Sequence, residues 1–144
     1  MSEKGQKRKI SAEAAEVPLL EVLQQTVCQQ LEGVPCRVDY DVPATIRTPG
    51  PVAAVQQLVG ALIDGAVSEA GDEVLELLIT ACPIGNTLEI EIADNGPPLA
   101  SRTKRIPWSA ASLRAHLYWQ DCPQGGVAVT AIIPVAGQAM IAAA

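Results

Sequence analysis

Hydrophobic residues recur at helical spacing in two stretches of the chain. The first stretch covers residues 16–32 and ends before Gly33, a residue type that commonly terminates helices. Its apolar positions are Leu20, Leu23, Val27 and Leu31. The second stretch covers residues 52–69, after a Pro-Gly-Pro turn at 49–51. Its interior holds two glycines, Gly60 and Gly65, and each costs about 1 kcal/mol relative to alanine, so a packing or functional reason is expected.

The remaining stretches predict a mixed sheet. Strands are expected at 34–42, 74–82, 87–94 and 127–135, with a hairpin turn at 83–86 and a further short strand at 45–48. Residues 95–107 are read as irregular, and residues 109–120 as a helix with Ser109 as its N-cap. The last strand is nearly all apolar, which favours an interior place in the sheet. This order predicts an α+β two-layer sandwich with about three helices on one face and the other face at least partly open.

Composition is compatible with one domain. The chain has 144 residues, of which 49% are hydrophobic, and it contains no Phe, so Val, Leu, Ile and Ala must build the core. We expect a domain over 16–135, a flexible basic tail over 1–15 and an Ala-rich tail over 136–144. The basic tail is either a solvated terminus or a docking arm for an acidic partner. Its cations are Lys4, Lys7, Arg8 and Lys9.

Charge and cysteine usage narrow the function classes. A formal net charge of −6 argues against nucleic-acid binding, which needs a basic surface. No apolar run reaches membrane-spanning length and no signal peptide is recognisable. The cysteines show neither CxxC spacing nor a nearby histidine cluster, so we expect no metal site and interpret them as small core residues in a reducing cytoplasm. They are Cys28, Cys36, Cys82 and Cys122.

The strand at 87–94 ends in Asp94-Asn95-Gly96-Pro97. Alone, this sequence could be a turn in which Asp94 accepts local backbone N–H groups. With the helix before it and the glycine-containing strand after it, residues 17–135 resemble the ATP-binding domain of sensor histidine kinases. That Bergerat-type fold is shared with gyrase, mismatch-repair ATPases and a class of chaperones. The resemblance implies that Asp94 accepts a hydrogen bond from the adenine amino group and that Gly96 lets the base approach the backbone.

The helix motif of that family has lost its functional side chains here. The stretch reads Ala61-Leu-Ile-Asp64-Gly65-Ala66. The asparagine that coordinates magnesium in the family falls on Gly65, and the first asparagine, or the catalytic glutamate, falls on Ala61. Positions 61 and 65 share one helix face, whereas Asp64 lies about a quarter-turn away and is a poor substitute. Asp64 and Gly65 therefore join Asp94 and Gly96 as relict candidates for nucleotide binding.

The phosphate-binding loops are altered as well. Pro98 replaces the second glycine of the first glycine motif, and Pro107-Trp108-Ser109 replaces the next one. Three nearby cations could contact an anion or simply be solvated: Arg102, Lys104 and Arg105. His116, the single histidine, is read as a structural or surface residue rather than a phospho-acceptor.

These losses predict a non-catalytic interaction module in two-component-type signalling, in a bacterial cytoplasm. A response regulator or a kinase is the expected partner, and a homodimer is a further alternative. We expect no catalytic residues and no resident cofactor, with ATP or ADP binding weakly at most and without magnesium. One competing function is a working ATP-binding domain of a histidine kinase. A phosphotransfer protein would need a helical hairpin for which the chain is too short, and the initial Met and Ala-rich end favour a free-standing protein.

Overall fold

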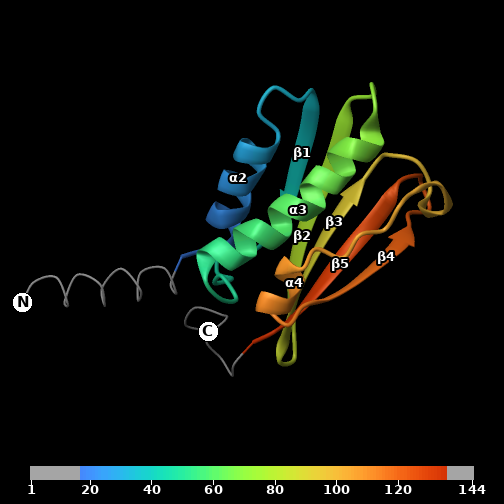
Figure 1. The fold of residues 1–144 in the computed structure, drawn as a ribbon. Helices are drawn as coiled ribbons and strands as arrows, with labels where there is room; N and C mark the ends of the chain where they lie inside the picture. The colour runs from blue at the N-terminus through green and yellow to red at the C-terminus, as the bar shows by residue number, and fades with distance from the viewer. Residues whose placement is uncertain (1–16, 136–144) are drawn as a thin grey trace, which may run out of the picture.

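Residues 17–135 form one mixed sheet with helices on one face, as described by a computed structural model (Figure 1). The predicted α+β two-layer architecture is confirmed. The predicted tails over 1–15 and 136–144 lie outside the described residues. The elements are α2 (Leu19–Gln30), β1 (Cys36–Asp41), α3 (Val52–Ala70), β2 (Leu75–Ile84), β3 (Thr87–Asp94), a 3-10 turn η1 (Leu99–Ser101), α4 (Ser109–Ser112), β4 (His116–Asp121) and β5 (Val127–Pro134).

The five strands are ordered β1-β2-β3-β5-β4 across the sheet. β1 runs parallel to β2, with Cys36 opposite Leu75, and every other neighbouring pair is antiparallel. The predicted hairpin joins β2 to β3 through a tight turn in which Gly85 adopts a φ of 58°. β5 lies between β3 and β4, so the prediction of an interior place for the apolar last strand is confirmed.

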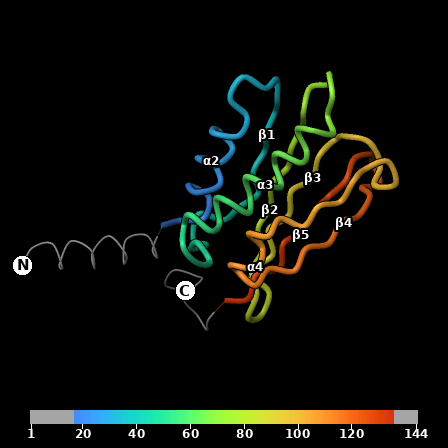
Figure 2. The backbone as a smooth tube through the Cα atoms, viewed as in Figure 1, coloured from blue at the N-terminus to red at the C-terminus, as the bar shows by residue number. Residues whose placement is uncertain are grey.

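The core lies between the sheet and helices α2 and α3. Alternate residues of β2 and β3 point at the helices and are buried, as expected for a sheet with one covered face. Figures 1 and 2 show α3 crossing in front of β2 and β3. Each fully buried Leu or Ile contributes roughly 1.5–3 kcal/mol of transfer free energy, so this layer supplies most of the stability. Its largest buried members include Leu19, Leu23, Leu58, Ile63, Leu75, Ile79, Leu88, Ile90 and Ile92.

The two glycines of α3 have different surroundings. A Cβ added to Gly60 would lie 3.4 Å from Oε1 of Gln30, at the contact between α3 and α2. Gly60 therefore allows close helix packing, which is the reason expected of a buried helical glycine. Gly65 has no atom within 4 Å of such a Cβ, so packing does not explain it.

The predicted helix over 109–120 is wrong. α4 ends at Ser112, Arg114 adopts a left-handed φ of 55°, and the chain continues as β4 along the free edge of β5. In β4, Leu117 and Trp119 face the helix side while Tyr118 faces the opposite side, so the alternation fits a strand. Ser109 is not the N-cap, because its hydroxyl is buried with no hydrogen-bond partner among the described residues.

Two smaller predictions also need correction. The strand expected at 45–48 is reduced to a single bridge between Pro18 and Arg47. The cysteines are not core residues: Cys28, Cys36 and Cys82 are exposed free thiols, and Cys122 is partly exposed. No helix in the described part is long and apolar enough to span a membrane.

Candidate functional site

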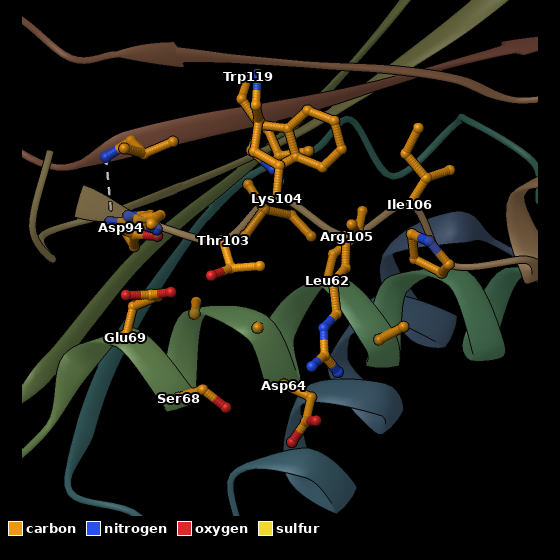
Figure 3. Close-up of a pocket in the computed structure, with 18 of the residues that line it drawn as sticks. Leu62, Asp64, Ser68, Glu69, Asp94, Thr103, Lys104, Arg105, Ile106 and Trp119 are labelled. Atoms are coloured by element: carbon orange, nitrogen blue, oxygen red, sulfur yellow. Dashed lines mark hydrogen bonds and ion pairs between the residues drawn. The ribbon is translucent and has the colours of Figure 1, made fainter. Parts of the chain in front are cut away.

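A cavity of about 530 Å³ lies between α3, the end of β3 and the segment 102–108. Figure 3 shows α3 on one side of it, carrying Leu62, Asp64 and Glu69, with the segment from Thr103 to Ile106 on the other. Apolar side chains from the sheet also line it: Ile92, Trp119, Val127 and Val129. This volume is in the usual range for small-molecule sites, so the cavity is the candidate functional site.

Asp94 is placed at the end of this cavity by the last residue of β3. Its Oδ1 accepts hydrogen bonds from the backbone N–H groups of Gly96, at 2.9 Å, and Val127, at 3.3 Å. Part of this network is drawn in Figure 3. The Asp94 carboxylate is therefore held in place from both sides of the strand end.

Arg102 occupies the same carboxylate through a two-pronged ion pair. Its Nη2 donates to Oδ1 of Asp94 at 2.6 Å and its Nη1 donates to Oδ2 at 2.8 Å. The side chains are 8% exposed for Arg102 and 7% for Asp94. Hydrogen bonding to Asp94 raises the pKa of Arg102 above its ordinary value, although burial opposes this rise. A bidentate arginine–carboxylate pair this well buried is among the stronger charge-assisted contacts in proteins.

The guanidinium of Arg102 also covers Gly96. The turn η1 brings the chain back so that Nε of Arg102 donates to the carbonyl of Pro97 at 2.8 Å. A Cβ added to Gly96 would lie 2.8 Å from Nη2 of Arg102. The space beside Gly96 is thus filled by a side chain of the protein itself.

Two further contacts fix the end of β3. The side chain of Asn95 accepts from the backbone N–H of Glu76 and donates to the carbonyl of Val74, at 2.9 and 3.0 Å. Gly126, with a φ of 89°, passes so close to the carbonyl of Asp94 that any Cβ would clash with it. Both contacts make the position of Asp94 a rigid feature of the fold.

The α3 wall offers little to a phosphate or a metal ion. Ala61 and Gly65 line the cavity without any polar side-chain atom, while Asp64 and Glu69 contribute carboxylates. Among residues 17–135 no cluster of three or more His, Cys, Asp or Glu could hold a metal ion. This wall therefore carries no group that would neutralise a triphosphate.

The structure brings together most of the residues that the sequence singled out. Asp64, Gly65 and Asp94 line the same cavity, as do the three predicted anion contacts, whereas Gly96 lies behind Arg102. The expectation that Arg102 is free to meet an anion is wrong, because it is paired with Asp94. The sequence analysis missed this ion pair; a strand-end carboxylate followed eight residues later by an arginine was the available signal. His116 is exposed on β4 and does not line the cavity.

The opposite wall is basic and apolar. Nζ of Lys104 lies 6.0 Å from the ring centre of Trp119, within the range of a cation–π contact. Arg105, Ile106 and Trp108 follow along the rim, and the last two are exposed. Trp108 sits where the family resemblance would place a glycine at the start of a helix, and α4 behind it has only four residues.

Comparison with known proteins supports the fold. No family model matches the chain, and no curated protein matches it. Three solved structures are similar to it. The catalytic domain of histidine kinase ThkA has a TM-score of 0.68 at 14% identity, covering 81% of this chain and 93% of that one. The mycobacterial sensor histidine kinase MprB has 0.67 at 14%, covering 82% and 96%. The histidine kinase domain of the E. coli osmosensor EnvZ has 0.63 at 14%, covering 87% and 91%. Residues 17–135 therefore have the fold of the histidine-kinase ATPase domain.

Proposed function

We propose that this domain is a non-catalytic interaction module of two-component-type signalling, acting in a bacterial cytoplasm with a response regulator or a kinase as its partner. The observation that carries the proposal is the buried ion pair between Arg102 and Asp94. In the resemblance to histidine kinases, Asp94 is the acceptor for the adenine amino group. In this chain Arg102 supplies the donors to that acceptor, and its guanidinium covers Gly96 as well.

The energetic cost of displacing Arg102 lowers any affinity for adenine. A base that reached Asp94 as it does in the family would have to replace two charge-assisted hydrogen bonds, each worth about 1.5–3 kcal/mol. The base returns one neutral bond, worth about 0.5–1.5 kcal/mol. A net loss near 3 kcal/mol reduces affinity by roughly a hundredfold, since 1.4 kcal/mol is a factor of ten.

Phosphoryl transfer needs groups that this cavity does not offer. Such catalysis depends on positioning and on electrostatic stabilisation by metal ions and cationic or backbone donors. Gly65 and Ala61 stand at the family's positions for the magnesium ligand and for the asparagine or catalytic carboxylate. Their side chains can supply neither role.

The competing function is a working ATP-binding domain in which Arg102 swings away from Asp94 when a nucleotide enters. The retained strand-end carboxylate and the cavity of about 530 Å³ favour it. Under this alternative, Lys104 and Arg105 would be the cations left to contact the phosphates.

Calorimetric titration with ATP and ADP, with and without magnesium, separates the two. We expect no magnesium-dependent binding to the wild-type domain. Arg102→Met frees the acceptor and should gain weak, magnesium-independent binding of both nucleotides, which Asp94→Asn in the same background should abolish. Arg37→Met, on the exposed edge strand β1, is the matched control and should behave as wild type. Micromolar, magnesium-dependent binding of ATP to the wild type would overturn the proposal.

A further inference from the structure

Two large apolar side chains project into solvent at the mouth of the cavity. Trp108 is 86% exposed and Ile106 is 71% exposed, more than any other large hydrophobic residue of the described part. They are separated by Pro107 and belong to the stretch Lys104–Trp108, which we call the lip. Exposed apolar patches beside a hollow are typical of protein-interaction sites, and tryptophan is prominent among interface hot spots.

The charge around the cavity is divided between its walls. Ion pairing with Asp94 neutralises Arg102, which leaves Lys104 and Arg105 as the cations of the lip. Asp64 and Glu69 lie on the α3 wall across the cavity, as Figure 3 shows. A partner can therefore gain from carboxylates placed against the lip, while carboxylates placed against α3 would be repelled.

The lip is poorly suited to a phosphate group. Pro107 has no backbone N–H, and α4 contributes a single helical turn behind it. The cavity, by contrast, is lined by apolar groups such as Leu62, Val127 and Trp119, which suit a hydrocarbon or aromatic side chain.

We propose that the lip and the cavity together form a docking surface for a protein segment that carries carboxylates beside one large apolar side chain. The apolar side chain enters the cavity between Leu62 and Trp119. The carboxylates meet Lys104 and Arg105, and Trp108 packs against the outside of the segment. This inference rests on the proposed function, because a bound nucleotide would compete for the same cavity.

The test is a selection of random-sequence peptides displayed on phage against the wild-type domain. Recovered peptides are expected to be enriched in Asp and Glu around one large apolar residue. Their affinity, measured by fluorescence anisotropy, should fall by at least about tenfold on Trp108→Ala and on Arg105→Glu, because binding energy concentrates in a few aromatic and arginine residues. Two matched controls should bind as wild type: Tyr118→Ala, exposed on the opposite face of the sheet, and Arg37→Glu on β1.

Three outcomes would overturn the docking surface: no recovered binder, binders without acidic enrichment, or binders that retain full affinity for both lip variants. Circular dichroism confirms that each variant is folded, and Trp108→Phe checks the position without removing an aromatic ring. Competition with magnesium-ATP separates this proposal from the proposed function. Micromolar displacement by magnesium-ATP would refute the non-catalytic role, whereas failure of the peptides alone would refute only the surface.

Discussion

The ion pair between Arg102 and Asp94 should be a measurable part of the stability of the fold. Arg102→Met keeps an unbranched side chain of partial length but removes both hydrogen bonds to the carboxylate and the one to Pro97. The carboxylate keeps its two backbone donors, so it is left only partly unsatisfied. Breaking one partner of a buried pair costs about 3–5 kcal/mol, and the remaining donors place Arg102→Met at the lower end, near 3 kcal/mol.

The complementary change is Asp94→Asn. The amide keeps one oxygen for the backbone donors of Gly96 and Val127, but its NH₂ group faces the guanidinium, where two donors meet. We expect a loss of about 3 kcal/mol here too. The double variant removes both charges together, so its loss should be smaller than the sum by about 2 kcal/mol, a coupling usual for contacting residues.

Urea denaturation of the four proteins measures this cycle, with Arg37→Met as an exposed control expected within about 0.5 kcal/mol of wild type. Because the pair is buried, the coupling should persist from about 0.1 M to 1 M salt, where exposed pairs are screened. Single losses below about 1 kcal/mol with a coupling near zero, as exposed pairs give, would refute the claim that Arg102 holds Asp94.

Three further predictions concern other features. Gly65→Ala should stabilise the domain by about 1 kcal/mol in thermal unfolding, because the position is exposed in mid-helix with open space around it; a destabilised variant would contradict this. Gly126→Ala should cost about 3 kcal/mol or more, because its Cβ would meet the carbonyl of Asp94, whereas Gly125→Ala, with positive φ but open space, should cost about 1 kcal/mol; equal losses in urea unfolding would contradict the close approach. Burial, with nearby carboxylates, raises the pKa of Cys122, so it keeps its proton to higher pH and iodoacetamide should modify it more slowly than the three exposed cysteines near pH 9; mass spectrometry of the digested peptides would show the opposite order if this is wrong.

The elements that the sequence predicts well are those whose pattern is local. α3 repeats its apolar residues over five turns, and the hairpin turn lies between two alternating strands, so both were placed within about two residues. β4 could not be assigned this way. Its apolar residues Leu117 and Trp119, with Leu113 before them, also fit a helix, and the free edge of β5 decides between the two. That edge exists only in the assembled sheet.

The candidate site shows the same division. Asp94 and the altered helix positions Ala61 and Gly65 can be recognised from sequence order alone. The occupation of Asp94 by Arg102 cannot, because it depends on how η1 turns the chain back over Gly96. Cysteine burial failed for a related reason, since three of the four thiols point away from the covered face.

The most direct test of the central claim is an NMR titration that follows the backbone amides of Gly96 and Val127, the two amides that share the Asp94 carboxylate with Arg102. Magnesium-ATP is added to the isotope-labelled wild-type domain up to about 1 mM, a concentration that would saturate a micromolar site. With Arg102 in place, neither amide resonance should move, and both should shift in Arg102→Met whether or not magnesium is present. Saturable, magnesium-dependent shifts of both amides in the wild type at micromolar nucleotide would contradict the account.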